Sequence, residues 1–107
     1  MSILINKAKC AELNLPIPHS FYTCESYVLH CISKGYMLNT RMCRYIGISN
    51  LHSVISSLRN KGIDLIVEHK RVYDPALQRI IPYPVDVVTM TVEQRKEYFS
   101  NKKPAKA

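Results

Sequence analysis

Apolar residues recur at helical spacing between residues 21 and 34. They follow the i, i+3, i+4, i+7 rule of an amphipathic helix, which predicts a helix over this range. Ser20 precedes it as a candidate N-cap, and Gly35 follows it as a stop. A shorter helix is predicted ahead of it, over about residues 7–13, with Asn6 as its cap. The apolar stripe of the longer helix consists of Phe21, Cys24, Val28, Cys31 and Ile32.

Two further helices are predicted on either side of a tight turn at Gly47. The first covers about residues 40–46 and the second about residues 50–60, and Gly62 ends the second. Ile48 lies alone between them as an apolar plug of the turn. The candidate caps are Asn39 or Thr40 for the first helix and Ser49 or Asn50 for the second. The residues predicted to face the core are Met42, Cys43, Ile46, Leu51, Val54, Ile55 and Leu58.

Downstream of these helices the pattern becomes typical of β structure. Residues 63–73 are rich in β-branched and aromatic residues and predict a strand. Residues 80–90 predict the returning strand, and the loop over residues 74–78 joins the two. Pro82 and Pro84 cannot donate a ladder hydrogen bond, so they indicate an edge or a bulge in the returning strand.

Two shorter elements complete the pattern. Residues 36–38 are enough for only a short strand. The T-x-E-Q pattern that begins at Thr91 predicts the capping box of a last helix, over about residues 92–100. Val92 and Phe99 are seven apart on that helix and can share one stripe. This stripe either closes the core of one subunit or pairs two subunits, and the sequence leaves both possibilities open.

Length and composition indicate one folded domain. The chain has 107 residues, of which 47% are apolar, which suits a single globular core. No apolar run approaches the ~20 residues that cross a bilayer, and the first residues lack a secretory signal. The four cysteines form no C-x-x-C pair, which favours buried thiols in a reducing compartment over a metal site. A cytoplasmic protein without metal or cofactor is therefore expected.

Candidate catalytic residues are lacking. Acidic residues are few and scattered, and the sequence contains neither a glycine-rich phosphate loop nor a nucleophile motif. We therefore expect a binding or structural protein and not an enzyme.

The positive charge of the chain is unevenly distributed. The formal net charge is +7, and residues 41–79 hold seven basic residues against three acidic ones. Residues 95–107 hold five basic residues against one. Such concentrated charge favours a polyanion as partner, nucleic acid before an anionic membrane. Yet no residue from Tyr45 to Leu58 is charged, so the best-formed predicted helix has a polar face of neutral side chains.

The segment LNTRMCRYIGISNLHSVISSLRNKGIDLI, from Leu38 to Ile66, combines several of these features. A capped helix carries the small residue Cys43 and ends in Ile-Gly, Ile48 plugs the turn, and S-x-L-R-x-K-G leads into a strand. In this the chain resembles winged helix-turn-helix domains, especially those of small bacteriophage and prophage regulators. The resemblance covers about residues 20–90. It departs from many phage-type relatives at Val54, where they carry a basic residue, and in its long, proline-broken hairpin.

The resemblance implies an α+β fold of the winged helix-turn-helix type. A three-helix core would carry a two-stranded β wing and an extra C-terminal helix. In this view residues 1–19 form an N-terminal extension, residues 20–91 the winged-helix domain, and residues 92–107 the C-terminal helix with a basic tail.

The resemblance also implies sequence-specific binding of double-stranded DNA by a transcriptional regulator or an excisionase-like architectural factor. The third helix would lie in the major groove, where neutral polar side chains read base edges. Basic residues around it and on the wing would contact phosphates, which position the protein without specifying sequence. The predicted base-reading residues are Asn50, His52, Ser53, Ser56 and Ser57. The predicted backbone-contacting residues are Arg41, Arg44, Arg59, Lys61, Lys70, Arg71 and Arg79.

Two alternatives remain open from the residues themselves. A neutral Ser/Asn/His face is also easier to desolvate than a charged one, which suits docking on a host transcription or replication protein. The same face is equally compatible with a solvent-exposed helix of a structural module. A homodimer through the C-terminal helix is a further possible assembly, because many DNA regulators bind paired half-sites.

Overall fold

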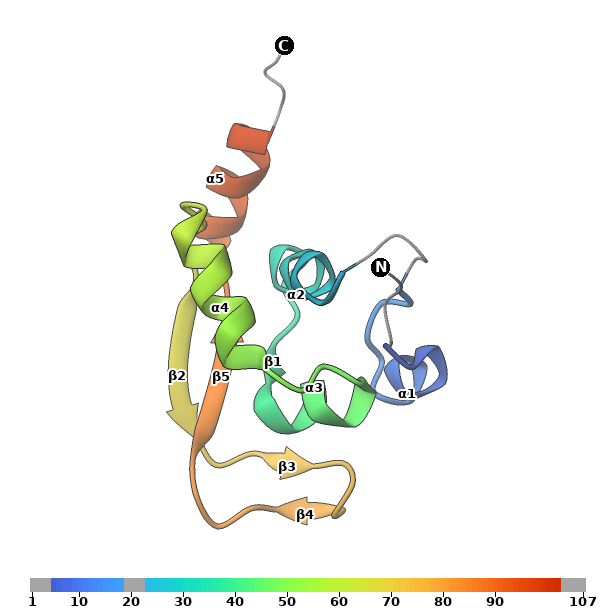
Figure 1. Ribbon diagram of the computed structural model, residues 1–107. Coiled ribbons are helices and arrows are strands. Elements are labelled where there is room, and N and C mark those ends of the chain that lie inside the picture. Colours follow the sequence, from blue (N-terminus) through green and yellow to red (C-terminus); the bar gives the residue numbers. More distant parts are fainter. Residues whose placement is uncertain (1–4, 19–22, 103–107) are drawn as a thin grey trace.

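The computed structural model describes residues 5–18 and 23–102, and it combines helices with short antiparallel strands. Helices α2, α3 and α4 share a core with a three-stranded sheet, and a separate two-stranded hairpin continues from the end of that sheet (Figure 1). The chain therefore has an α+β fold, as predicted. The helices are α1 (Lys7–Glu12), α2 (Cys24–Ser33), α3 (Thr40–Ile46), α4 (Leu51–Asn60) and α5 (Val92–Lys102). The strands are β1 (Leu38–Asn39), β2 (Ile66–Lys70), β3 (Tyr73–Asp74), β4 (Arg79–Ile80) and β5 (Val85–Thr89).

Short-range capping determines where most of the helices begin. The amide oxygens of Asn6, Asn39 and Asn50 accept from backbone N–H groups at the starts of α1, α3 and α4, at 2.9–3.1 Å. Thr91 and Gln94 form a reciprocal capping box at the start of α5. Each of these caps satisfies an N–H group that has no partner inside the helix. The predicted starts of these four helices are confirmed.

The predicted start of the second helix is wrong. Helix α2 begins at Cys24, because Thr23 forms a capping box with Ser26 in which both side chains bond to the other residue's backbone N–H. The predicted cap Ser20 and the stripe residue Phe21 lie outside the described residues. Tyr27, which the periodicity omitted from the stripe, is fully buried.

The core lies between α2, α3, α4 and the sheet. Most of the predicted inward-facing residues are buried there, whereas Cys24, Met42 and Val54 are only partly covered. Gly47 ends α3 with φ 112°, a left-handed conformation that disfavours other residues. Ile48 follows at 2% exposure, which confirms it as the plug of the turn between α3 and α4. Fully buried members of this core are Tyr27, Val28, Cys31, Ile32, Leu38, Cys43, Ile46 and Val88.

Residues 5–18 pack against this core and do not extend away from it. Cys10 is fully buried, and Leu15 is 6% exposed. The backbone N–H of Asn6 donates to the carbonyl oxygen of Ile46 at 2.7 Å. The hydroxyl of Tyr27 donates to the carbonyl oxygen of Pro16 at 2.6 Å. Residues 5–18 of the predicted N-terminal extension are thus bonded to α2 at Pro16 and to α3 at Asn6.

The β region departs from the single long hairpin that the sequence predicted. Strand β5 lies in the middle of the sheet, in the order β1-β5-β2, and both of its pairings are antiparallel. Residues 63–73 do not form one strand, because the chain leaves this sheet after Lys70 and re-pairs as β3. The returning strand is interrupted around Pro82 and Pro84, which have no N–H to donate. The predicted wing is therefore two successive hairpin segments, β2–β5 and β3–β4.

The β3–β4 segment is attached to α3 by a charged cluster. Asp74 is 3% exposed, and its carboxylate accepts from Arg41 at 3.1 Å. The same carboxylate accepts from the backbone N–H groups of Ala76 and Leu77, which shapes the turn. Arg41 also donates to the hydroxyl of Tyr83. Because these bonds cross between helix and hairpin, they fix the position of the hairpin relative to α3.

The cysteines are free thiols, and three of the four are buried. Burial raises the pKa of the Cys31 thiol to about 11, and it raises the pKa of the Cys43 thiol as well. These thiols therefore stay protonated at neutral pH and act as small apolar side chains. The predicted burial is confirmed for Cys10, Cys31 and Cys43.

Helix α5 packs against the rest of the chain at few points. Tyr98 contacts the core, whereas Val92 is 51% and Phe99 39% exposed. Arg95 lies so close to Gly35 that a Cβ there would stand 2.9 Å from its Nη1. The predicted stripe thus leaves two of its residues open, and self-association through α5 stays a prediction. In the described part of the chain, every helix is too short or too polar to cross a membrane.

Candidate functional site

The outward face of α4 is open to solvent. His52, Ser53 and Ser56 are exposed, whereas Leu51, Ile55 and Leu58 on the opposite side are buried. In the view of Figure 1, α4 is drawn in front of the β2–β5 pair, with its N-terminal end directed toward the α3 turn. The face is not covered by the β3–β4 hairpin or by α5. The predicted polar face therefore has the accessibility that contact with another molecule requires.

Asn50 and Ser57 have structural contacts that the sequence did not show. The Oδ1 atom of Asn50 accepts from the backbone N–H of Ser53 at 3.1 Å and forms the helix cap. The predicted base-reading residue Asn50 therefore has its Oδ1 occupied by the cap, and its amide is not free to pair with adenine at two points. Ser57 is half-buried at the boundary with α2, where its hydroxyl donates to Glu25 at 2.6 Å.

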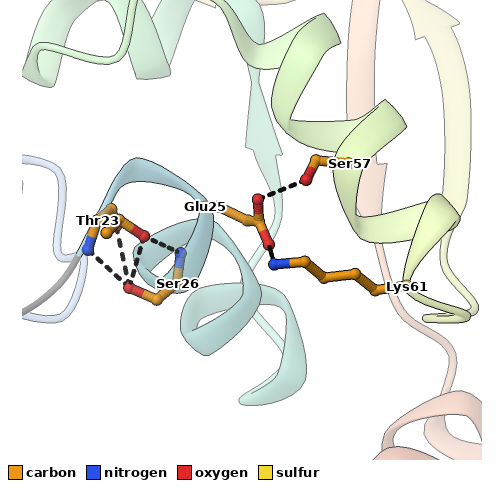
Figure 2. A network of polar contacts seen from close by, with 5 residues as sticks. All are labelled: Thr23, Glu25, Ser26, Ser57 and Lys61. Carbon is orange, nitrogen blue, oxygen red and sulfur yellow. Dashed lines mark hydrogen bonds and ion pairs between the residues drawn. The ribbon is translucent and has the colours of Figure 1, made fainter.

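Glu25 connects α2 to the C-terminal half of α4. Figure 2 shows its carboxylate between Ser57 and Lys61, with one oxygen directed at each. The hydrogen bonds from Lys61 and from Ser57 hold the pKa of this carboxyl below its ordinary value of 4.5. A depressed pKa means that the folded state favours the ionised form, so the network contributes to stability above pH 4.5. Lys61 is thus already paired within the chain.

Glu25→Gln should lower the free energy of unfolding at pH 7 by about 1 kcal/mol or less, because Lys61 is largely exposed and the ion pair is screened. The difference from wild type should shrink as the pH falls below 4.5, and it should be lost once the pH passes the lowered pKa of the folded-state carboxyl. Urea denaturation at a series of pH values measures this. Glu68→Gln is the matched control, because Glu68 pairs with Lys70 but both side chains are about half exposed. A difference that persists unchanged at pH 3 would contradict the assignment.

His52 meets the sheet at Asp86. Its Nδ1 lies 3.7 Å from one carboxylate oxygen of Asp86, and Nε2 of His69 lies 2.8 Å from the other. The three residues come from α4, β5 and β2, so this cluster links the helix to the strand pair. His52 and His69 are 84% and 70% exposed, whereas Asp86 is 21% exposed.

The predicted phosphate-contacting residues fall into two groups. Arg41 is held by Asp74, Lys61 by Glu25 and Lys70 by Glu68. Within the described residues, the remaining four form no ion pair and are exposed. Arg41 is therefore a structural residue that attaches the β3–β4 hairpin to α3. The unpaired group consists of Arg44, Arg59, Arg71 and Arg79.

Three carboxylates that organise this region were not identified from the sequence. Glu25 and Asp74 each accept a hydrogen bond from a residue on another element, and Asp86 lies 2.8 Å from Nε2 of His69 on β2. A local signal existed only for Asp74, because Asp-Pro is typical of a turn. The other two contacts depend on helix packing and strand register, which the sequence pattern does not specify.

The structure presents an exposed polar face on α4, which contacts the β2–β5 strand pair at Asp86. The four exposed arginines of the unpaired group lie on α3, on α4, between β2 and β3, and on β4. Comparison with known proteins finds no family model, no curated protein and no solved structure that matches this chain.

Proposed function

We propose that this protein binds double-stranded DNA, with α4 in the major groove and the β2–β5 and β3–β4 segments beside the backbone. The observation that supports this most is the exposure of His52, Ser53 and Ser56 on a helix whose other side is buried. A helix of this kind fits the major groove, and its neutral side chains offer donors and acceptors to base edges.

The order of the elements supports a winged-helix reading of the fold. Helices α3 and α4 are joined by a tight turn at Gly47, and strands follow α4 directly. The sheet order β1-β5-β2 places a short strand from between the first two core helices beside the returning strand of the hairpin. Such a domain presents its third core helix and its hairpin to the same duplex.

The arginines and the uncharged face of α4 would have different roles in the complex. Of the unpaired residues, Arg44 lies on α3, Arg59 on α4 and Arg79 on β4. Arg71 lies between β2 and β3. These arginines would neutralise phosphates and give the complex a salt-dependent affinity. The uncharged face of α4 then supplies discrimination between sequences. A small regulator or architectural factor is the role that fits this division.

A selection from random duplex oligonucleotides at moderate salt tests the proposal. We expect enrichment of a short motif and a retardation that weakens steeply as salt rises. If no motif is enriched and binding stays weak even at low salt, DNA binding is wrong. Docking of the neutral α4 face on a protein would then become the favoured function.

A further inference from the structure

The carboxylate of Asp86 lies between two imidazoles that belong to different parts of the candidate interface. Oδ1 is 2.8 Å from Nε2 of His69, and Oδ2 is 3.7 Å from Nδ1 of His52. One histidine stands in the first turn of α4 and the other in the hairpin strand β2. The carboxylate is mostly covered, whereas both rings project into solvent.

Strand register maintains half of this arrangement. His69 and Asp86 are direct partners in the antiparallel β2–β5 ladder, so their side chains leave the same face of the sheet close together. Glu68 and Lys70, the neighbours of His69, point to the opposite face because strand side chains alternate. Asp86 is therefore the acidic residue of this ladder whose side chain lies on the sheet face toward His52 of α4.

The contacts also determine which ring atoms remain available. The Nδ1 side of His52 and the Nε2 side of His69 are directed at the carboxylate. His52 Nε2 and His69 Nδ1 lie on the far sides of the rings and are free to meet another molecule. His69 is in close contact at one nitrogen, whereas the 3.7 Å separation of His52 from the carboxylate is longer than a hydrogen bond. An imidazole oriented at one nitrogen presents its other nitrogen in a restricted direction, which is what reading a base edge needs.

Asp86 also places a negative charge where a duplex would approach. Phosphates are repelled by a carboxylate that lies close to them, so this charge lowers affinity for every sequence. A base edge that bonds well to the two imidazoles offsets that cost, and a wrong base does not. Repulsion combined with positioned contacts is a general way to increase specificity.

We propose that Asp86 is a specificity-determining residue. It positions His52 of α4 and His69 of β2 so that the two imidazoles contact bases together, and its charge weakens binding to duplexes whose bases do not bond to them. The inference rests on the proposed DNA binding. It assigns the junction of α4 with the β2–β5 ladder as the place where sequence is discriminated most strongly.

The test compares wild type with Asp86→Asn on two duplexes, the selected motif and a scrambled version of it. Asp86→Asn should bind the scrambled duplex about threefold to tenfold more tightly, because one repulsive charge is gone. Its preference for the motif should fall about tenfold, because the imidazoles lose their common anchor. Glu68→Gln is the matched control: it removes the same charge from the opposite face and should leave the preference unchanged.

A second comparison separates positioning from charge. The double variant His52→Ala/His69→Ala should lose the same preference without gaining affinity for the scrambled duplex. Adding Asp86→Asn to this double variant should cause no further loss of preference, because Asp86 acts on sequence preference through the two histidines that are already removed. Imidazole NMR signals of free protein provide a readout without DNA, and the His69 ring resonances should move in Asp86→Asn.

The outcomes distinguish the two proposals. Suppose that wild type binds the motif, but that Asp86→Asn and Glu68→Gln each change the affinity for the motif and for the scrambled duplex by the same factor. The inference is then wrong, and DNA binding stands. Unmoved His69 resonances in a folded Asp86→Asn protein also overturn it. If wild type shows no retardation of any duplex, the proposed function fails and the inference fails with it.

Discussion

Replacing Arg59, Arg71 and Arg79 together with glutamine should weaken binding to every duplex by roughly a hundredfold at moderate salt. These residues are exposed and form no ion pair within the described ranges. If each contacts one phosphate, the slope of log K against log salt should become shallower by about 3. The preference for a selected motif should survive, because phosphate contacts position the protein without reading sequence. Titration by fluorescence anisotropy at several salt concentrations measures affinity and slope together.

The matched control removes the same charge elsewhere. Lys7 and Lys9 belong to α1, and Lys34 follows α2, so none of them lies on α4 or the hairpins. Their triple replacement with glutamine should reduce affinity only slightly, through the general field of the protein. Equal losses in the two triple variants would contradict a local interface around α4 and would leave only a diffuse positive surface.

Leu15→Ala should destabilise the protein by about 2–5 kcal/mol, the usual cost of removing a buried leucine side chain. Leu15 is 6% exposed and belongs to the same core as α2, α3 and α4. Ile17→Ala provides the control, because Ile17 lies two residues away but is 52% exposed. Its cost should stay within about 0.5 kcal/mol. Urea denaturation followed by circular dichroism gives both values.

The comparison decides whether residues 5–18 are part of the cooperative fold. A loss of stability only in Leu15→Ala means that this segment unfolds together with the core. Equally small effects in both variants would mean that the segment detaches without cost.

Local signals predicted the starts of α1, α3, α4 and α5, because each cap depends on residues close in sequence. Asn39 and Asn50 cap through the N–H three residues ahead, and Gly47 ends α3 through its own backbone conformation. The exposed face of α4 followed from the same periodicity that buried Leu51 and Leu58. These features need no knowledge of the rest of the chain.

Features that depend on distant contacts were not predictable in this way. Glu25 and Ser57 are 32 residues apart, and Arg41 and Asp74 are 33 apart. The break of the long hairpin depends on which strand pairs with which, and β-branched residues favour a strand without choosing its partner. For the same reason the sequence showed Asp86 only as one residue of a strand, although the register pairs it with His69 and the packing of α4 brings His52 to within 3.7 Å of it.

The bonds from Arg41 to Asp74 and Tyr83 have a mechanical consequence for the proposed complex. They tie α3 to the β3–β4 hairpin, and the short turn at Gly47 ties α3 to α4. The reading helix and the hairpin are then held at one spacing and angle. A duplex that touches both has to match this spacing, and a duplex that does not match it has to bend or change its groove width. Steps that deform easily, such as TA and CA, would therefore be favoured even where no side chain reaches the bases.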